Sequence, residues 1–308
     1  MAFKSLEEII ELNKDKLNTV ARISLAAAHD KHSLEAIQRA MNEGIVKPVL
    51  VGDKAQIMPI LAEIGMDVPE EDIYDVPDVA EACKKAVALI NEGKADFLMK
   101  GKAETSDYLR AVVNKETGLG LGGTMSMFTA HATECYDRIL VPVDGALVTY
   151  PTLEQKKDII QNTVNAMLAL GWECPKVGVV CCKEKADPKM PETMDAAELK
   201  AMNQRGEITG CIVEGPISFD IATSVEDAQM KGFDSPCAGT CDVLVAHDIH
   251  AGNIMGKMMS VLCKSKLGGF LVGSKCPIVF SSRGSSSEEK YLSICLAAIA
   301  AANMKKDA

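Results

Sequence analysis

Short apolar runs of strand length alternate with longer stretches of helical period along most of the chain. The predicted strands are Val46–Val51, Ala95–Met99, Met125–Thr129, Arg138–Val143, Lys176–Cys182, Gly210–Val213, Cys241–Ala246, Gly269–Val272 and Pro277–Ser281. The predicted helices are Leu34–Asn42, Lys54–Ile64, Asp78–Asn91, Ser106–Lys115, Leu153–Leu170, Asp195–Asn203, Val225–Lys231, Ile254–Cys263 and Ser287–Ala301. Such alternation favours mainly parallel sheets with helices on both faces, and continuous apolar runs fit strands that are buried on both faces. The sequence therefore predicts an α/β fold.

The length of the chain predicts two domains. It has 308 residues, and a domain takes about 150. No long stretch rich in Pro, Gly or Ser separates them, so we expect two three-layer α/β domains that are closely associated, with a cleft between them. The chain is predicted to cross between the domains within Pro142–Pro151 and to return near Leu267–Gly269. The predicted domains are residues 1–142 with 268–308, and residues 143–267.

Charge and hydropathy argue against nucleic-acid and membrane proteins. The chain carries 33 Lys and Arg against 43 Asp and Glu, a net charge of −10, and it has no basic cluster of the size that phosphate backbones need. No apolar run reaches the roughly 18 residues of a membrane span. The N-terminal residues lack the pattern of a secretory signal, so we expect a cytoplasmic protein whose eleven cysteines are reduced.

Several familiar site motifs are absent or stand in the wrong context. Gly118, Gly120 and Gly123 fit the G-x-G-x-x-G spacing, but a predicted helix precedes them and a strand follows, the reverse of a dinucleotide-binding turn. There is no P-loop, no G-x-S-x-G and no C-x-x-C. His247 and Asp248 would point to opposite faces of a strand, so no metal site is predicted. We interpret that segment as a loop that contacts a ligand through Asp248 and Asn253.

The most informative segment is Pro277–Lys290, where an apolar strand is predicted to run through a polar loop into a helix. Ligands of open α/β folds bind at this kind of junction. The N-terminus of the helix offers free N–H groups, Gly284 allows close approach of the backbone, and Arg283 provides a fork for phosphate. The simpler interpretation is a capping box, formed by Ser285 with Glu288 or by Ser286 with Glu289. The two interpretations are compatible.

A second junction of the same kind lies in Asp96–Arg110. The strand leads through Gly101 to a helix for which Thr105 is the expected N-cap, and Arg110 follows 1.4 turns later. An ordinary cap beside a surface arginine is the alternative interpretation. Two basic, hydroxyl-rich junctions together favour a small anion that binds between the domains.

The motifs, taken in order, resemble the phosphate acetyl/butyryltransferase family, and most closely its butyryl branch. The matching stretches are Ala26–Ile37, Met99–Gly101 with Thr105 and Leu109–Val112, Tyr136–Arg138, Leu153–Lys156, Asp187–Pro191 with Asp195-Ala196, Gly215-Pro216 with Asp220, Gly232 with Ser235-Pro236, Ala238-Gly239, Asp248 with Ala251–Asn253, and Pro277–Val279 with Ser282-Arg283. They extend over nearly the whole chain.

The resemblance implies a homodimer of two-domain subunits with an interdomain active-site cleft, and an architecture related to the isocitrate and isopropylmalate dehydrogenases. It implies exchange of a short-chain acyl group, butyryl or similar, between coenzyme A and inorganic phosphate, with coenzyme A as a substrate and no permanently bound cofactor. Ser282 and Arg283 match the pair that handles the acyl phosphate. The base that activates the thiol is either Glu289 or Glu288. The remaining substrate-binding candidates are Thr105, Arg110, Thr124, Asp248, Asn253, Gly284 and Ser285.

The chain departs from the family pattern at Gly123-Thr124, at Val148 and at Ser285. We expect the thiolate of coenzyme A to attack the acyl carbonyl directly in a ternary complex, with Ser282, Arg283, Thr105 and helix N–H groups as donors to the developing charges. No nucleophile from the enzyme is required. The alternatives are a non-catalytic homologue that binds acyl-CoA, and a metal-dependent dehydrogenase-like enzyme of the same architecture.

Overall fold

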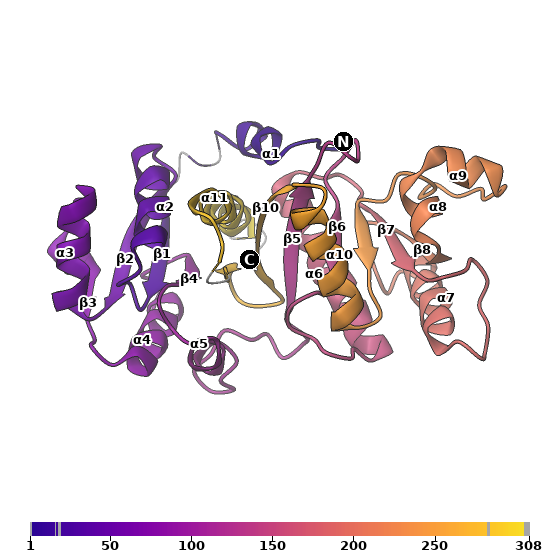
Figure 1. Ribbon diagram of the computed structural model, residues 1–308. Helices are drawn as coiled ribbons and strands as arrows, with labels where there is room; N and C mark the ends of the chain where they lie inside the picture. The colour runs from indigo at the N-terminus through magenta and orange to yellow at the C-terminus, as the bar shows by residue number, and fades with distance from the viewer. Residues whose placement is uncertain (1, 16, 18–19, 282–283, 305–308) are drawn as a thin grey trace. The chain divides into compact units, whose positions relative to one another are not determined.

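The computed structural model describes residues 2–15, 17, 20–281 and 284–304 (Figure 1). The chain forms two compact units, each of which is described here by itself. Unit 1 comprises residues 1–9 and 123–267, and unit 2 comprises residues 10–122 and 268–308. The units change over at 122/123 and 267/268, whereas the sequence predicts domain boundaries at 142/143 and 267/268. The predicted domain limits stay a prediction.

Unit 2 is built on a mainly parallel sheet. Its strands lie in the order β3 (Ile73–Asp75), β2 (Val46–Gly52), β1 (Ala21–Ala26), β4 (Phe97–Lys100), β11 (Ile278–Val279) and β10 (Lys266–Val272), where β10 begins in unit 1 and its pairing with β11 is antiparallel. Its helices are α2 (Lys31–Asn42), α3 (Lys54–Ile64), a 3-10 turn (Glu70–Asp72), α4 (Val79–Asn91), α5 (Thr105–Val112) and α11 (Ser287–Met304). Helix α1 (Leu6–Leu12) crosses from unit 1 into unit 2.

The strand order of unit 2 places three loops together. Strand β4 lies between β1 and β11, and both pair with it in parallel. Their carboxyl ends therefore meet at one edge of the sheet, where β1 leads into α2, β4 into α5 and β11 into α11. This edge is where open α/β sheets bind ligands.

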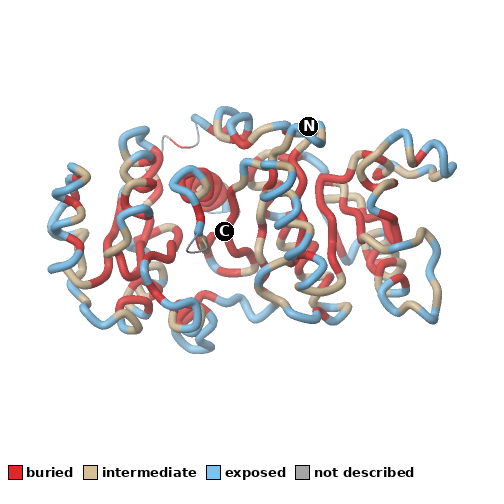
Figure 2. Tube along the Cα trace, in the orientation of Figure 1, coloured by how far each residue is buried: buried red, intermediate tan, exposed pale blue. Residues whose placement is uncertain are grey.

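Helix α11 is buried on all sides for most of its length. Residues Lys290–Ala301 are buried without interruption, as the red helix in Figure 2 shows. Its alanine-rich sequence, with small and apolar residues all round, fits a helix that packs on several neighbours rather than on one face.

Unit 1 holds a separate parallel sheet in the order β6 (Val141–Val143), β9 (Val243–Val245), β7 (Lys176–Val180) and β8 (Ile212–Ile217). Strand β5 (Ser126–Ala132) forms an antiparallel bridge through His131 with Leu140, the residue before β6. The helices are α6 (Leu153–Leu170), α7 (Pro191–Gln204), α8 (Phe219–Thr223), α9 (Val225–Met230) and α10 (Ile249–Val261). No helix in the described ranges is long and apolar enough to span a membrane.

The predicted fold class, two α/β units with mainly parallel sheets, is confirmed. Strands β1 and β3 and helices α1 and α8 were not predicted from the sequence, and the predicted starts of α7 and α10 are several residues late. Strand β1 was not predicted because Arg22 and Ser24 interrupt its apolar run. In the fold, Arg22 pairs with Asp72, and the buried hydroxyl of Ser24 donates to the carbonyl oxygen of Ala86 at 3.2 Å.

Candidate functional site

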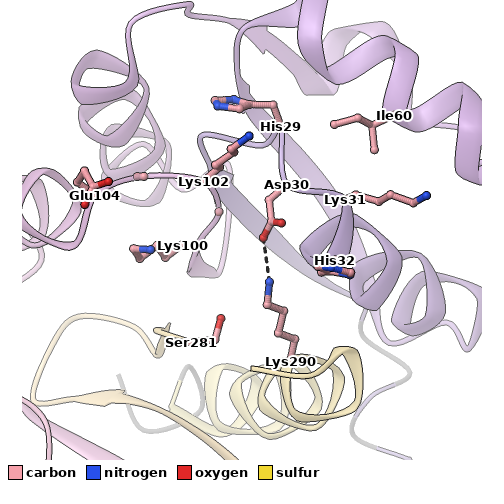
Figure 3. A pocket seen from close by; sticks show the side chains of 12 residues that line it. His29, Asp30, Lys31, His32, Ile60, Lys100, Lys102, Glu104, Ser281 and Lys290 are labelled. Atoms are coloured by element: carbon pink, nitrogen blue, oxygen red, sulfur yellow. Dashed lines mark hydrogen bonds and ion pairs between the residues drawn. The ribbon is translucent and has the colours of Figure 1, made fainter. Parts of the chain in front are cut away.

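A pocket of about 570 Å³ opens where the carboxyl ends of β1, β4 and β11 meet in unit 2 (Figure 3). The β1–α2 segment contributes residues 29–32, the β4–α5 segment contributes residues 100–104, and Ser281, Lys290 and Ile60 complete the lining. Four lysines and two histidines face two carboxylates there, so the pocket is cationic. It suits a phosphorylated or carboxylated ligand.

The β4–α5 side of the pocket depends on a close backbone contact. Gly101 donates its N–H to the carbonyl oxygen of Ala26 at 2.9 Å, and Lys102 donates to that of Ala27 at 2.9 Å. A Cβ at position 101 would lie 2.4 Å from the oxygen of Ala27. Glycine therefore allows the two loops to touch. Lys100 on one side of Gly101 is 6% exposed, and Lys102 on the other side is exposed.

An ion pair between Asp30 and Lys290 connects the β1–α2 wall of the pocket to the α11 wall. The ammonium of Lys290 donates to Asp30 Oδ2 at 2.8 Å and to the hydroxyl of Ser33 at 3.1 Å. Burial alone would raise the pKa of Asp30, but the hydrogen bonds from Lys290 and Ser33 outweigh burial, and the pKa is lowered. A charged carboxylate thus compensates the lysine, which is 5% exposed.

His29 is placed beside Lys102 (Figure 3). Burial first, and then the positive charge of Lys102, lower the pKa of His29 below its ordinary value. The imidazole is therefore neutral at pH 7. Its Nδ1 atom is buried and has no hydrogen-bond partner. One polar atom of the pocket is left for a ligand or a water molecule.

The predicted site residues of unit 2 belong to the β4–α5 and β11–α11 segments. Ser282 and Arg283 fall outside the described residues, but Ser281 lines the pocket directly before them. The predicted N-cap at Thr105 is wrong: Glu104 is the N-cap residue and Thr105 is the first helical residue. Arg110 is on the last turn of α5, largely exposed, with its guanidinium 3.4 Å from Asp107.

The two candidate bases at the start of α11, Glu288 and Glu289, have different partners. The Ser286 hydroxyl accepts the N–H of Glu289 at 3.1 Å, so the Ser286–Glu289 cap forms in part. The carboxylate of Glu289 accepts from Ser285 Oγ at 2.6 Å. Glu288 instead pairs with Arg39 of α2, which also covers the ring of Tyr291. The alternative cap of Ser285 with Glu288 is therefore wrong.

The remaining candidates lie in unit 1, where each has a contact within its own unit. The N–H of Thr124 donates to Asp158 at 3.0 Å. Asp248 caps α10 by accepting from the N–H of Ala251 at 2.9 Å, and Asn253 donates to the carbonyl oxygen of Gly145 at 3.0 Å. These contacts explain the residue types locally, and contact with a ligand stays a prediction for all three.

The three residues that depart from the family pattern, Gly123, Val148 and Ser285, each lie against or bind a carboxylate nearby. Gly123 lies beside Asp158, where a Cβ would sit 3.3 Å from the carboxylate. Val148 donates its N–H to the buried carboxylate of Asp144 at 2.7 Å. Ser285, 8% exposed, holds Glu289.

Five pocket residues were not among the site residues predicted from the sequence: His29, Asp30, Lys100, Lys102 and Lys290. The first three lie in two stretches that match the family, Ala26–Ile37 and Met99–Gly101. Without a predicted strand at Ala21–Ala26, however, nothing placed His29 and Asp30 at a sheet edge. A helical lysine such as Lys290 is expected in solvent unless a partner is known.

Comparison with known proteins gives consistent matches. A sequence model described as phosphate acetyl/butaryl transferase matches residues 77–298. The chain is 45% identical to a phosphate butyryltransferase of Clostridium acetobutylicum over 97% of this chain and 99% of that one. It is 40% identical to a phosphate acetyltransferase of Thermotoga maritima over 96% and 99%. Among solved structures, a branched-chain phosphotransacylase from Enterococcus faecalis superposes with a TM-score of 0.78, at 26% identity over 92% and 99%.

Proposed function

Because this chain belongs to the phosphate acetyl/butyryl transferase family and is a phosphate acyltransferase, we propose that it moves a butyryl or similar short-chain group between coenzyme A and phosphate. The reaction is acyl-CoA + phosphate = acyl phosphate + CoA. The greater identity to a phosphate butyryltransferase than to a phosphate acetyltransferase, 45% against 40%, supports the longer acyl group. The dehydrogenase-like alternative is set aside by the family.

The observation that carries the proposal is the cationic pocket at the sheet edge where Ser281 leads into Ser282 and Arg283. Both substrates of the reaction carry phosphate groups. Buried ammonium groups and the N-termini of α2, α5 and α11 at one edge suit such ligands. Ser282 and Arg283 are proposed to contact the oxygens of the acyl phosphate.

The proposed chemistry needs no covalent enzyme intermediate. The sulfur of coenzyme A forms a bond to the acyl carbon while the bond from that carbon to the phosphate oxygen breaks, and phosphate leaves. A thiol with a pKa of about 8.5 is mostly protonated at pH 7, so a carboxylate that accepts its proton accelerates the attack. Arg283, Ser282 and N–H groups of α11 would stabilise the charge on the carbonyl oxygen and on the leaving phosphate.

Of the two candidate bases, we propose Glu289. Its carboxylate is held by Ser285 in the loop that follows Ser282 and Arg283. Glu288 is engaged by Arg39 on α2. The substrate contacts of Thr105, Arg110, Thr124, Asp248, Asn253 and Gly284 are proposed from the sequence and the resemblance. The homodimer is proposed from the resemblance, and the cytoplasmic location from the sequence.

The test is release of free coenzyme A from acetyl-, butyryl- and hexanoyl-CoA, with and without inorganic phosphate, followed with a thiol reagent. An enzyme-only blank is needed because the chain has eleven cysteines. We expect phosphate-dependent turnover with butyryl-CoA preferred. Preference for acetyl-CoA would correct the acyl group. Binding of coenzyme A without turnover on any acyl-CoA would favour the non-catalytic homologue.

Arg283→Ala and Arg283→Lys test the proposed contact with phosphate. Loss of a charged hydrogen-bond donor should lower kcat/KM about 10- to 150-fold in the alanine variant. Lysine keeps the charge but not the two-pronged geometry, and should recover part of the loss. Wild-type turnover and phosphate affinity in Arg283→Ala would contradict the assignment.

A further inference from the structure

The cations of the pocket in unit 2 are not equivalent. Lys290 is compensated by Asp30 at 2.8 Å, and Lys31 is paired with Glu63 of α3 at 2.5 Å. These two lysines have structural partners. Lys102 has no ion pair with any residue that the structure describes, and its charge acts on His29 more strongly than the carboxylates of Asp53 and Asp30 do. The β4–α5 side of the pocket therefore carries two lysines, Lys100 and Lys102, against one carboxylate, Glu104.

The β4–α5 side also carries buried polar groups. Lys100, 6% exposed, brings a second ammonium group into the lining. The Nδ1 atom of His29 is buried without a hydrogen-bond partner. A buried polar atom without a hydrogen bond is unfavourable, so a ligand that supplies a hydrogen bond there gains affinity.

Two helices begin at this pocket without a side-chain cap. The N-cap residues of α2 and α5, Asp30 and Glu104, make no capping hydrogen bond. Asp53, Asp78, Thr152 and Asp248 cap α3, α4, α6 and α10 with their side chains, whereas α7 and α8 of unit 1 also begin without such a cap. The carboxylate of Asp30 is turned toward Lys290 instead (Figure 3). N–H groups at the first turns of α2 and α5 are thus left for another acceptor.

We propose that Lys100, Lys102 and His29 form a binding site for a phosphate group of the substrates, with Asp30 and Lys290 as the pair that holds its far side in place. The proposal rests on the proposed function, and it assigns residues that the resemblance does not. The phosphate is either inorganic phosphate or a phosphate group of coenzyme A. A pocket of about 570 Å³ is large enough for either group together with water.

His29 provides a binding signal that does not depend on turnover. Its imidazole has a lowered pKa in the free protein. A bound phosphate dianion would favour the protonated imidazole and raise that pKa. NMR titration of the histidine ring protons of the full chain, with His29 assigned by a His29→Gln variant, measures this change. The chain has only five histidines, and the buried His131 of unit 1 serves as an internal reference.

Three ligands separate the possible sources of the phosphate group. A saturable upward shift of the His29 pKa with inorganic phosphate alone would support an inorganic phosphate site. A shift with coenzyme A but not with its 3′-dephospho form would support a site for the 3′-phosphate. No shift of His29 with any of the three ligands would overturn the proposal.

Kinetics provide the second test. We expect Lys102→Gln to raise the KM for one phosphorylated substrate about 10- to 100-fold, with a smaller change in kcat. Lys47→Gln, an exposed lysine of β2 outside the pocket, is the matched control and should leave both constants unchanged. Wild-type KM values for phosphate and for acyl-CoA in Lys102→Gln would reject the pocket and leave the proposed function standing. A His29 shift in a protein without turnover would reject the function and leave the pocket standing.

Discussion

Lys290 of α11 donates to the carboxylate of Asp30 at the start of α2, across 260 residues of sequence, with a separation of 2.8 Å. The side chain of Lys290 is 7% exposed and that of Asp30 is 22% exposed. The bond joins the buried helix of unit 2 to the loop that follows β1. It therefore fixes two walls of the pocket relative to each other.

Removal of one partner of the Asp30–Lys290 pair should lower the free energy of unfolding by more than the intact pair contributes to it. Asp30→Asn leaves the Lys290 ammonium buried beside a neutral amide, and we expect it to lower the free energy of unfolding by about 2–3 kcal/mol. Lys290→Met removes the buried charge and leaves Asp30 with Ser33 and solvent, so the loss should be nearer 1 kcal/mol. Urea denaturation of both variants and of the double variant measures the coupling energy.

The stability of the double variant, Asp30→Asn with Lys290→Met, shows whether the two residues stabilise each other. If the two losses simply add, the residues do not stabilise each other, and the pair has no positioning role. A double variant that is more stable than Asp30→Asn would show that the unpaired ammonium caused most of the loss.

Substitution of Glu289 should lower kcat, whereas substitution of Glu288 should lower stability only slightly. Glu289→Gln removes the proposed base and should lower kcat about 100-fold or more with little change in stability. Glu288→Gln removes an exposed ion pair with Arg39, which is worth about 0.2–1 kcal/mol of stability, and should leave kcat within about twofold. Steady-state kinetics with thermal denaturation separate the two. A larger loss of kcat in Glu288→Gln would reverse the assignment.

Gly101 tests the contact between the loops after β1 and β4. In Gly101→Ala, the new methyl carbon would lie 2.4 Å from the oxygen of Ala27 and 2.7 Å from that of Ala26, both of which are backbone atoms. The loops must separate, and we expect a loss of about 2–4 kcal/mol of stability together with weaker phosphate binding. Gly120→Ala is the matched control, because nothing lies within 4 Å of its Cβ position. Equal denaturation midpoints for the two variants would contradict the close contact.

The sequence was sufficient where a local pattern decides the structure. The loop after β4 and the loop before α11 were found because an apolar run ends at a polar segment and a helical period follows. The fold class followed from the same alternation.

The pocket needed contacts between distant segments. His29 and Asp30 follow a strand whose apolar run is broken by Arg22, and the reason for that arginine, an ion pair with Asp72, appears only in the fold. Lys290 looks like a solvent-facing helical residue until Asp30 is placed beside it. Local propensity also misplaced the cap of α5 at Thr105, since Glu104 occupies the cap position without a side-chain bond. Pairings of this kind depend on topology and cannot be read from spacing along the chain.

His131 predicts a pH dependence of stability in unit 1. The residue is 3% exposed on β5, with Nδ1 2.9 Å from the Ser265 hydroxyl, and burial first, then the charge of Lys257, lower its pKa to about 4. In the unfolded chain a histidine has a pKa of about 6.5. Above that value both states are neutral, and the stability is complete.

As the pH falls from about 6.5 to about 4, the unfolded state binds a proton that folded His131 does not bind. Unfolding then becomes easier by up to about 1.4 kcal/mol per pH unit, or roughly 2–3 kcal/mol across the window, and no further below it. His131→Gln should remove this part of the slope because glutamine does not titrate. His29 and His247, whose pKa values are also lowered by burial, add to the slope of both proteins, so the difference between the two isolates His131. Exposed His250→Gln is the control, and denaturation midpoints between pH 7 and pH 4 that fall equally in all three proteins would contradict the burial of a neutral imidazole at position 131.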